Sequence, residues 1–408
     1  MNRNTVIIIF ALPRWDQPIS SPALSLAKEF AQTNRVFYVE HPYSWKDVIS
    51  EWKTPEVKKR KKALFRKKDI YTNPADFPKN LTVVTPPVTY PINSLPPGFL
   101  YNVLAHRNDQ RIFNTIRKVC ADYNVKEWVF INSFDPLFAR DFPDDLNPLV
   151  KVYQCMDDLS QVDYSARHGI RLEQDIVRKF DITLCTSKEL TRINSEFTDH
   201  SYFHPNAADI SLFKKAVEVD LPKPKELQGI DKKIIGFTGS IEYRTDFELL
   251  LKLAKHHIDK QLVFVGPLRA PEMSEMGIVD LPNVTMVGPK KITELPAYLK
   301  YMDVVIIPYK KNKLTRSIYP LKINEYLGAG RPVVAIHFSE DINTFNDVAW
   351  IADDHDAFIK MVGEAIETDS KEKLKKRIQR AEKNTWTARV EQFWDIVDTW
   401  EKTKTTHD

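Results

Sequence analysis

Ser317-Ile-Tyr-Pro-Leu-Lys-Ile-Asn-Glu-Tyr-Leu-Gly-Ala-Gly-Arg-Pro-Val-Val-Ala335 is the stretch that decides the fold. Before it runs Met302-Asp-Val-Val-Ile-Ile-Pro308, a short apolar run that is typical of a buried parallel strand. Pro320 suits a first helical turn, two glycines then end the helix, and residues 331–335 enter the next strand. The stretch therefore predicts a strand, a loop, a helix and a strand. The helix N-terminus lies open at the carboxyl end of a strand, where free N–H groups suit a diphosphate.

Residues 320–334 resemble the nucleotide-sugar motif of the GT-B glycosyltransferases, specifically the retaining family 4 (glycosyltransferase group 1) and its bacterial polysaccharide-biosynthesis relatives. In that family the acidic residue at the position of Glu325 holds the ribose hydroxyls of the donor. The family pattern has a further glutamate at the position of Ser317, so this chain carries half of the two-glutamate motif.

The resemblance covers nearly the whole chain and implies an α/β protein of the GT-B class. Two Rossmann-like domains would face each other across a cleft, with a C-terminal helix that returns to the N-terminal domain. We expect an acceptor-side domain at residues 1–215, a nucleotide-sugar-binding domain at 225–385 and the returning helix at 386–408. Residues 220–225, rich in proline and charge, are the expected linker.

The composition is that of an ordinary globular protein. Its 408 residues carry 59 Lys and Arg against 55 Asp and Glu, a net charge of +4 that is too balanced to imply nucleic acid. The three cysteines are far apart, which favours buried free thiols in a reducing cytoplasm. Apolar runs stay well short of the ~20 residues of a membrane span. We therefore expect a cytoplasmic protein.

The first loop of the chain is an acceptor-side candidate by resemblance. Residues 6–10, 22–31 and 35–40 predict a βαβ unit whose loop lacks the Gly-x-Gly-x-x-Gly fingerprint, so dinucleotide binding is not expected. The resemblance places this loop at the cleft, with Arg14, Trp15 and Asp16 on it. The alternative is a Trp that covers the sheet edge beside an Arg–Asp surface pair.

Asp157 is the predicted catalytic carboxylate of the first domain. The strand at 150–155 ends in Asp157-Asp158, in the loop where family 4 enzymes often carry a histidine that hydrogen-bonds the donor sugar. A carboxylate there could orient the acceptor hydroxyl, accept its proton or bind the donor sugar. An aspartate can instead cap the following helix. We assign Asp157 to the site and Asp158 to the cap.

The second domain should hold the donor. Small residues after the strand at 233–238 allow close backbone approach to phosphate, and the family brackets the base with backbone near residues 266–267 and 287–290. Arg244 and Lys322 would neutralise the leaving diphosphate as catalytic residues, or each could make a surface ion pair. The predicted donor-binding set is Gly239, Ser240, Gly266, Ser317, Tyr319, Pro320, Leu321 and Glu325.

Lys53 to Lys68 forms a basic stretch with nine Lys or Arg residues and one Glu, close to Trp45 and Trp52. Basic stretches with aromatic neighbours can lie on an anionic membrane surface. A solvated excursion is the alternative. The membrane interpretation makes the protein peripheral on the inner face of the cell membrane.

Together these patterns predict transfer of a sugar from a nucleotide-diphospho-sugar, with UDP-sugar as our guess, to a glycan or lipid-linked acceptor in cell-surface polysaccharide biosynthesis. No Asp-x-Asp motif lies in a suitable loop, so we expect metal-independent transfer without a cofactor beyond the donor. Retention of anomeric configuration is implied only by the family. Two alternatives stay open. One is a degenerate GT-B protein that binds nucleotide sugar or scaffolds a membrane complex, and the other is a sugar-nucleotide 2-epimerase.

Overall fold

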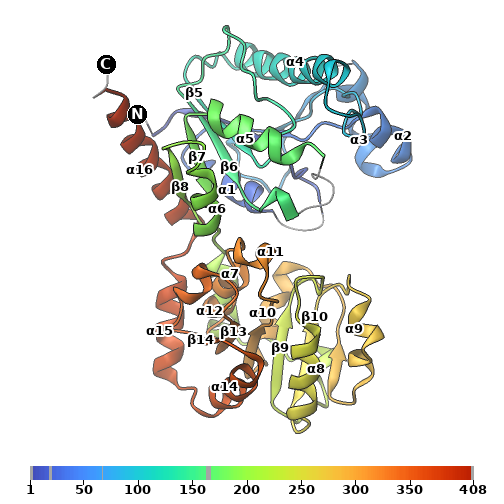
Figure 1. Cartoon of the computed structure of the whole chain (residues 1–408), viewed down its shortest axis with the longest axis vertical. Helices are drawn as coiled ribbons and strands as arrows, with labels where there is room; N and C mark the ends of the chain where they lie inside the picture. The colour runs from blue at the N-terminus through green and yellow to red at the C-terminus, as the bar shows by residue number, and fades with distance from the viewer. Residues whose placement is uncertain (1–2, 18–20, 67, 162–166, 406–408) are drawn as a thin grey trace. The chain divides into compact units, whose positions relative to one another are not determined.

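The computed structural model describes residues 3–17, 21–66, 68–161 and 167–405. The chain folds into two compact units (Figure 1). The first contains Met1–Pro205 and Arg389–Asp408, and the second contains Asn206–Ala388. No helix in the described ranges is both long enough and apolar enough to cross a membrane.

The first unit is built on a sheet that is parallel except at one edge. Its strands follow the order β3-β4-β2-β1-β5-β6-β7-β8, and the β3–β4 pair is antiparallel. Continuous buried runs such as Val129 to Ile131 are what a sheet covered on both faces requires. The strands are β1 (Val6–Ala11), β2 (Val36–Glu40), β3 (Tyr71–Thr72), β4 (Leu81–Val84), β5 (Trp128–Ser133), β6 (Val150–Cys155), β7 (Ile182–Cys185) and β8 (Ser201–Phe203).

Helices connect these strands and cover the sheet. Ser187 caps α6, because its Oγ accepts a hydrogen bond from Leu190 N at 3.1 Å. Helix α5 runs from Gly169 to Lys179, and residues 162–166 before it lie outside the described part. The helices are α1 (Pro22–Phe30), α2 (Trp45–Ser50), α3 (Pro55–Arg66), α4 (Phe99–Asp122), the 3-10 turn η1 (Leu159–Gln161), α5 (Gly169–Lys179) and α6 (Lys188–Asn194).

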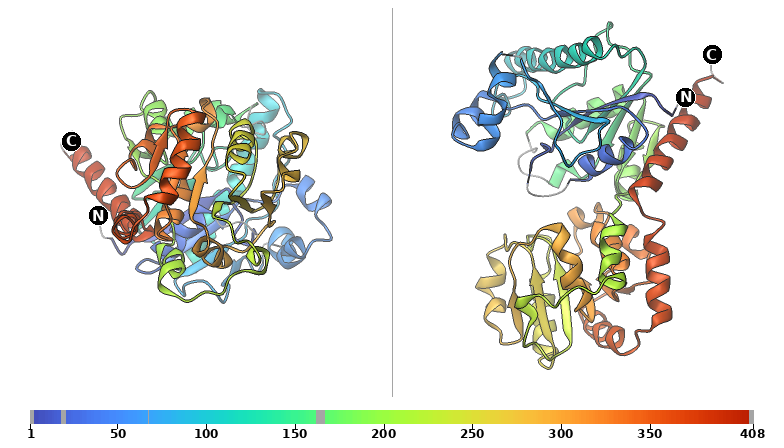
Figure 2. Two further views of the ribbon diagram at one scale, coloured as in Figure 1. Left: turned by 90° about the horizontal axis from the view of Figure 1, so that it is seen from below. Right: turned by 180° about the vertical axis from the view of Figure 1, so that it is seen from behind.

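The last helix, α16 (Trp386–Thr405), returns to the first unit, as the fold class predicts (Figure 2). Its Phe393 ring meets Phe30 of α1 edge to face, with centroids 4.9 Å apart. Trp394 packs on the same phenylalanine at 6.3 Å. Aromatic burial of this kind fastens the end of the chain to α1.

The second unit is a parallel sheet in the order β11-β10-β9-β12-β13-β14. Chain connections run outward in opposite directions from β9 and β12, so the carboxyl ends of these strands form the topological switch point where ligands bind in open α/β sheets. Its strands are β9 (Ile234–Thr238), β10 (Gln261–Val265), β11 (Val284–Met286), β12 (Val304–Ile307), β13 (Val333–Ile336) and β14 (Trp350–Ala352). Its helices are α7 (Ile210–Glu218), α8 (Phe247–His256), α9 (Glu272–Glu275), α10 (Leu295–Lys300), α11 (Lys313–Arg316), α12 (Leu321–Gly328), α13 (Glu340–Asn343), α14 (His355–Glu367) and α15 (Lys371–Ala381).

The division between the units falls earlier than the expected end of the first domain at residue 215. Helix α7 belongs to the second unit, since it contacts α10 and α12. Its Phe213 packs closely on Gly328 of α12. The expected linker at 220–225 also lies inside this unit, where Lys300 Nζ donates to Asp220 at 2.7 Å. The proline-rich composition of that segment did not reveal these contacts.

Candidate functional site

Helix α12 starts directly beside the switch point of the second unit. Pro320 is its N-cap, one position before the helical turn in which we expected it, and offers no side-chain hydrogen bond. Within the described residues, the N–H groups of Leu321 and Lys322 have no acceptor. The positive end of the helix dipole therefore faces outward with two N–H donors available to an anion.

Lys322 lies against the end of β9. A Cβ atom added at Gly239 would lie 2.5 Å from Lys322 Nζ, and Gly239 has a φ of +114°. A Cβ at Gly266, which follows β10, would collide with the carbonyl oxygen of Gly239. The three predicted residues thus meet at one point, and both glycines are needed there for space and for backbone conformation.

The ammonium group of Lys322 makes no hydrogen bond or ion pair with any described residue, and its Nζ lies 5.6 Å from the Phe237 ring centroid. Glu325 stands one turn further along α12, partly buried. Burial raises the pKa of the Glu325 carboxyl, and the positive charge of Lys322 lowers it in part. Its carboxylate likewise has no hydrogen-bond partner among the described residues.

Other predicted donor-binding residues serve the architecture around α12. Ser317 is almost fully buried and closes α11, where its N–H donates to Leu314 O at 3.1 Å. Tyr319 is buried as well, and its hydroxyl accepts from Asn324 Nδ2 at 3.2 Å. Ser240 lies partly exposed after Gly239. The contacts described for these side chains do not point to a ligand, so their roles in donor binding stay predictions.

Arg244 already has a counter-ion. Its guanidinium forms an ion pair with Glu242 and lies 5.4 Å from the centroid of the Tyr309 ring. This ion pair is the alternative that the sequence left open for Arg244. Of the two predicted cations, Lys322 is therefore the one without an ion pair to a described carboxylate.

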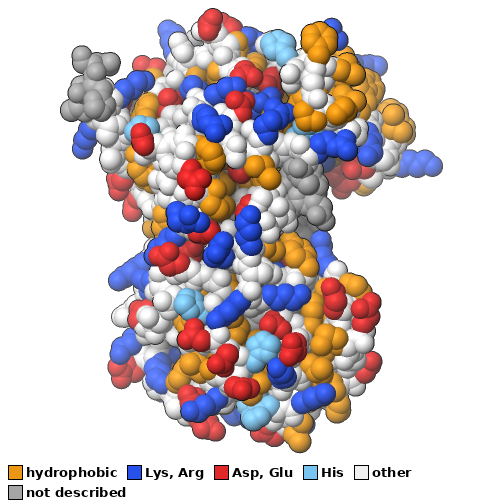
Figure 3. Space-filling view, in the orientation of Figure 1, with side chains coloured by type: hydrophobic (Ala, Val, Ile, Leu, Met, Phe, Trp, Pro, Cys, Tyr) orange, Lys and Arg blue, Asp and Glu red, His pale blue; other side chains and the backbone are white. Residues whose placement is uncertain are grey.

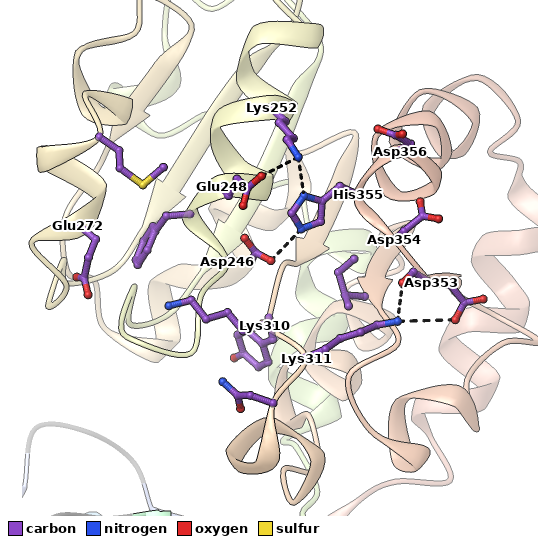
Figure 4. Close-up of a pocket in the computed structure, with 15 residues that line it drawn as sticks. Asp246, Glu248, Lys252, Glu272, Lys310, Lys311, Asp353, Asp354, His355 and Asp356 are labelled. Atoms are coloured by element: carbon purple, nitrogen blue, oxygen red, sulfur yellow. Dashed lines mark hydrogen bonds and ion pairs between the residues drawn. The ribbon is translucent and has the colours of Figure 1, made fainter.

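A cavity of about 900 Å³ opens between the first turns of α8 and α14 (Figure 4). Asp246 caps α8 through Leu249 N and accepts from His355 Nε2 at 3.0 Å. His355 Nδ1 in turn lies 3.4 Å from Lys252 Nζ. The predicted site residues do not line this cavity, and sequence reasoning had no motif that indicated it.

Two aspartates follow β6 in the first unit, and one of them caps the next turn, as we expected. Asp158 is nearly buried, and its Oδ1 accepts from Ser160 N at 2.9 Å, which caps the turn η1. Asp157 is exposed at the loop surface. Behind them, Glu173 accepts from Tyr153 Oη at 2.9 Å, and burial raises the pKa of Glu173 to about 7. The catalytic role of Asp157 stays a prediction.

The three candidates of the first loop are tied to neighbouring elements. Arg14 lies 3.6 Å from the Tyr43 ring centroid, and Lys59 Nζ lies 3.8 Å from that of Trp15. Asp16 accepts two hydrogen bonds of 2.8 Å from Arg60, whose buried guanidinium also binds Glu40. The basic stretch therefore includes one arginine that points inward.

Comparison with known proteins agrees with this architecture. Residues 232–391 match the family model described as glycosyl transferases group 1. The match covers most of the second unit and less than half of the chain. A curated relative, named putative teichuronic acid biosynthesis glycosyltransferase TuaH, of Bacillus subtilis (strain 168), is 30% identical over 167 residues. That match spans 40% of this chain and 42% of the relative, less than half of its length.

Solved structures extend the likeness to the whole chain at the level of fold. Sucrose-phosphate synthase from Thermosynechococcus elongatus has a TM-score of 0.64 at 13% identity and covers 98% of this chain and 100% of its own. Anabaena Alr3699/HepE, in complex with UDP and glucose, has a TM-score of 0.61 at 12% identity and covers 96% and 99%. The residues that match the group 1 model are thus part of a GT-B fold.

Proposed function

We propose that the protein transfers a sugar from a nucleotide-diphosphate donor to a glycan or lipid-linked acceptor in cell-surface polysaccharide biosynthesis. One observation carries the proposal: Lys322 and Glu325 are both uncommitted on a helix whose first N–H groups are available. The names of its relatives support it. TuaH is described as a teichuronic acid biosynthesis glycosyltransferase, and HepE was solved with UDP and glucose.

Each group has a role that follows from its chemistry. The diphosphate accepts hydrogen bonds from the N–H groups of Leu321 and Lys322, and the Lys322 ammonium stabilises the charge that develops on the leaving nucleotide. Glu325 accepts hydrogen bonds from the ribose hydroxyls, because an ionised carboxylate only accepts. Gly239 leaves room for the Lys322 ammonium, and Gly266 leaves room for the backbone of Gly239.

The proposal includes UDP as the nucleotide and transfer without a metal ion. Lys322 supplies the positive charge on the diphosphate that a divalent cation supplies elsewhere. The proposed reaction requires no cofactor beyond the donor itself. Retention of configuration rests on the family resemblance alone. Asp157 would act on the acceptor hydroxyl or the donor sugar from its exposed loop.

Helix α3 carries most of the basic stretch on which the membrane interpretation rests, and α2 precedes it. Trp45, Ile49 and Phe65 on these helices, and Trp52 between them, are exposed apolar side chains. Basic and apolar side chains gather over these helices at the upper right of Figure 3. Amphipathic helices of this composition lie in the interface of anionic membranes. We propose that this surface, the α2–α3 surface, holds the protein on the inner leaflet near a lipid-linked acceptor.

Thermal stabilisation by UDP, GDP, ADP and dTDP, each with Mg²⁺ and with EDTA, tests the donor proposal. A ligand at ~100 times its Kd adds about 2.7 kcal/mol to the free energy of unfolding. We expect a shift with UDP that is equal in Mg²⁺ and EDTA. Binding without consumption of any UDP-sugar would favour the degenerate alternative. A shift that requires Mg²⁺ would contradict metal independence.

A further inference from the structure

Strands β9 and β12 separate before the switch point. β9 pairs with β10 as far as Thr238, whereas its pairing with β12 ends at Gly236. Gly239 N donates to Val265 O of β10. Because consecutive residues of a strand direct their N–H groups to opposite neighbours, Thr238 N points to the β12 side, beyond the last pair of that ladder. Thr238 is 1% exposed, so its N–H needs a partner from elsewhere in the protein.

Tyr326 of α12 supplies that partner. Its hydroxyl accepts a hydrogen bond from Thr238 N at 2.9 Å and also lies 3.4 Å from both Thr238 Oγ1 and Thr238 O. Tyr326 is completely buried, and burial raises the pKa of its hydroxyl, which therefore stays protonated. Among the residues that the structure describes, these are the hydrogen bonds that join α12 to β9. Sequence reasoning gave Tyr326 no role, although it lies within the stretch that decides the fold.

Tyr326 and Lys322 lie on one face of α12, because they are four residues apart. Tyr326 contacts Thr238, and one turn earlier Lys322 lies against Gly239, the residue that follows Thr238. A hydrogen bond to a backbone N–H is confined to a narrow range of lengths and angles. The Tyr326 bond therefore sets how far the first turn of α12 reaches beyond β9, and with it the place of the Lys322 ammonium.

The other contacts of α12 position it less sharply. The helix packs on α7 and α15 and against β12 and β13, and apolar packing of this kind is non-directional. Asn324 Nδ2 donates to Tyr319 Oη at 3.2 Å and to Asn206 O at 3.5 Å, and neither acceptor belongs to the sheet. Within the described residues, the Tyr326 hydroxyl is thus the hydrogen-bonded link between α12 and the sheet.

We propose that Tyr326 is a positioning residue of the donor site, which acts on the diphosphate through Lys322. This inference rests on the proposed transferase function, in which the Lys322 ammonium meets the diphosphate. Tyr326 is sealed from solvent and does not itself touch the ligand. Without its hydroxyl, α12 keeps its apolar packing but not its fixed depth against β9, so the ammonium leaves the place that Gly239 provides for it. Weaker binding of the diphosphate is the consequence.

Tyr326→Phe tests this inference, with Tyr301→Phe as the matched control. The Tyr301 hydroxyl also bonds to the backbone inside the second unit, to Leu221 O at 2.6 Å, but Tyr301 precedes β12 and lies at the opposite edge of the sheet. UDP affinity is measured by calorimetry, and melting temperature is measured without ligand. Both variants should melt below the wild type, because each loses a hydrogen bond. Only Tyr326→Phe should bind UDP more weakly, by at least about tenfold, because the contact of a charged donor with the diphosphate is lost.

A second comparison distinguishes the positioning of Lys322 from general damage to the site. Lys322→Met removes the ammonium but keeps an unbranched side chain. In that background, Tyr326→Phe should still lower the melting temperature but should change UDP affinity by less than about twofold. Equal affinity losses in both backgrounds would overturn the inference, because Tyr326 would then act independently of Lys322.

Two further results would also contradict the inference. If the wild type binds UDP and Tyr326→Phe or Lys322→Met binds it equally well, the tyrosine has only a structural role, and this inference alone falls. If the wild type binds none of UDP, GDP, ADP and dTDP, the proposed function is wrong and the inference falls with it.

Discussion

The ammonium group of Lys322 occupies the space that a side chain at position 239 would need. The lysine comes from the first turn of α12 and the glycine directly follows β9, so the contact joins α12 to β9 beside the switch point. Since a Cβ there would push the ammonium away, the glycine sets where the positive charge of Lys322 lies.

Gly239→Ala should weaken UDP binding. It places a Cβ 2.5 Å from Lys322 Nζ and strains a backbone with a φ of +114°. Gly277→Ala is the matched control, because its φ of +68° carries strain but no atom lies within 4 Å. Both should lose about 1–3 kcal/mol of unfolding free energy in urea. Only Gly239→Ala should bind UDP more weakly, as measured by calorimetry. Equal UDP affinities of the two variants would mean that Lys322 does not contact the ligand.

Glu325→Ala should remove the contribution of the ribose hydroxyls to binding. A hydrogen bond to a charged acceptor contributes about 1.5–3 kcal/mol, which corresponds to a loss of at least about tenfold in UDP affinity. The wild type should prefer UDP over 2′-deoxy-UDP, and the variant should bind both equally. Glu367→Gln, at the exposed end of α14, is the control. A persistent preference for UDP in Glu325→Ala would show that another group reads the ribose.

The sequence best predicted the features that depend on residues close together in the chain. The order of strand, helix and strand around α12 follows from apolar runs and two glycines, and the resemblance supplied the GT-B class. The meeting of Gly239, Gly266 and Lys322 could be expected because each follows or begins an element at the same sheet edge.

The sequence did not predict contacts between segments that lie far apart in the chain. Arg60 was one basic residue among many, and its burial with Glu40 and Asp16 depends on how α3 packs on β2. The pair formed by His41 Nδ1 and Asp135 Oδ2, 2.6 Å apart, depends on which strands neighbour β1, which periodicity alone does not specify. The early division of the units depends on the packing of α7, a contact that linker composition cannot indicate.

Neutralising the α2–α3 surface should release the protein from anionic vesicles. Lys53, Lys58 and Arg66 are exposed, and each near-surface charge contributes ~1 kcal/mol to binding. Changing all three to Gln should lower binding to phosphatidylglycerol vesicles roughly 100-fold at low salt. Arg60 is left intact because it is buried in ion pairs.

The control for that experiment changes Lys371, Lys375 and Lys383 to Gln, which removes the same charge from the exposed surface of and beside α15. This triple variant should bind vesicles as the wild type does. Equal losses in both variants would indicate non-specific attraction by net charge. If the wild-type protein does not bind these vesicles, the membrane proposal is wrong.

Glu173 should make the stability of the protein depend on pH. Burial raises its pKa from 4.5 to about 7, although hydrogen bonds from Tyr153 and Cys155 lower it in part. Between these values the folded protein retains a proton that the unfolded chain has lost. The free energy of unfolding therefore falls as the pH rises through this window, by at most about 1.4 kcal/mol per unit from this group.

Glu173→Gln removes this titration while an acceptor oxygen remains for the Tyr153 hydroxyl. Urea unfolding at about pH 5 and about pH 8 should show that the variant gains stability relative to the wild type at the higher pH. Asp109 is buried with its pKa also raised to about 7, so the Glu173→Gln variant should keep part of the pH dependence of the wild type. A difference between variant and wild type that is constant with pH would mean that Glu173 is already ionised throughout the window.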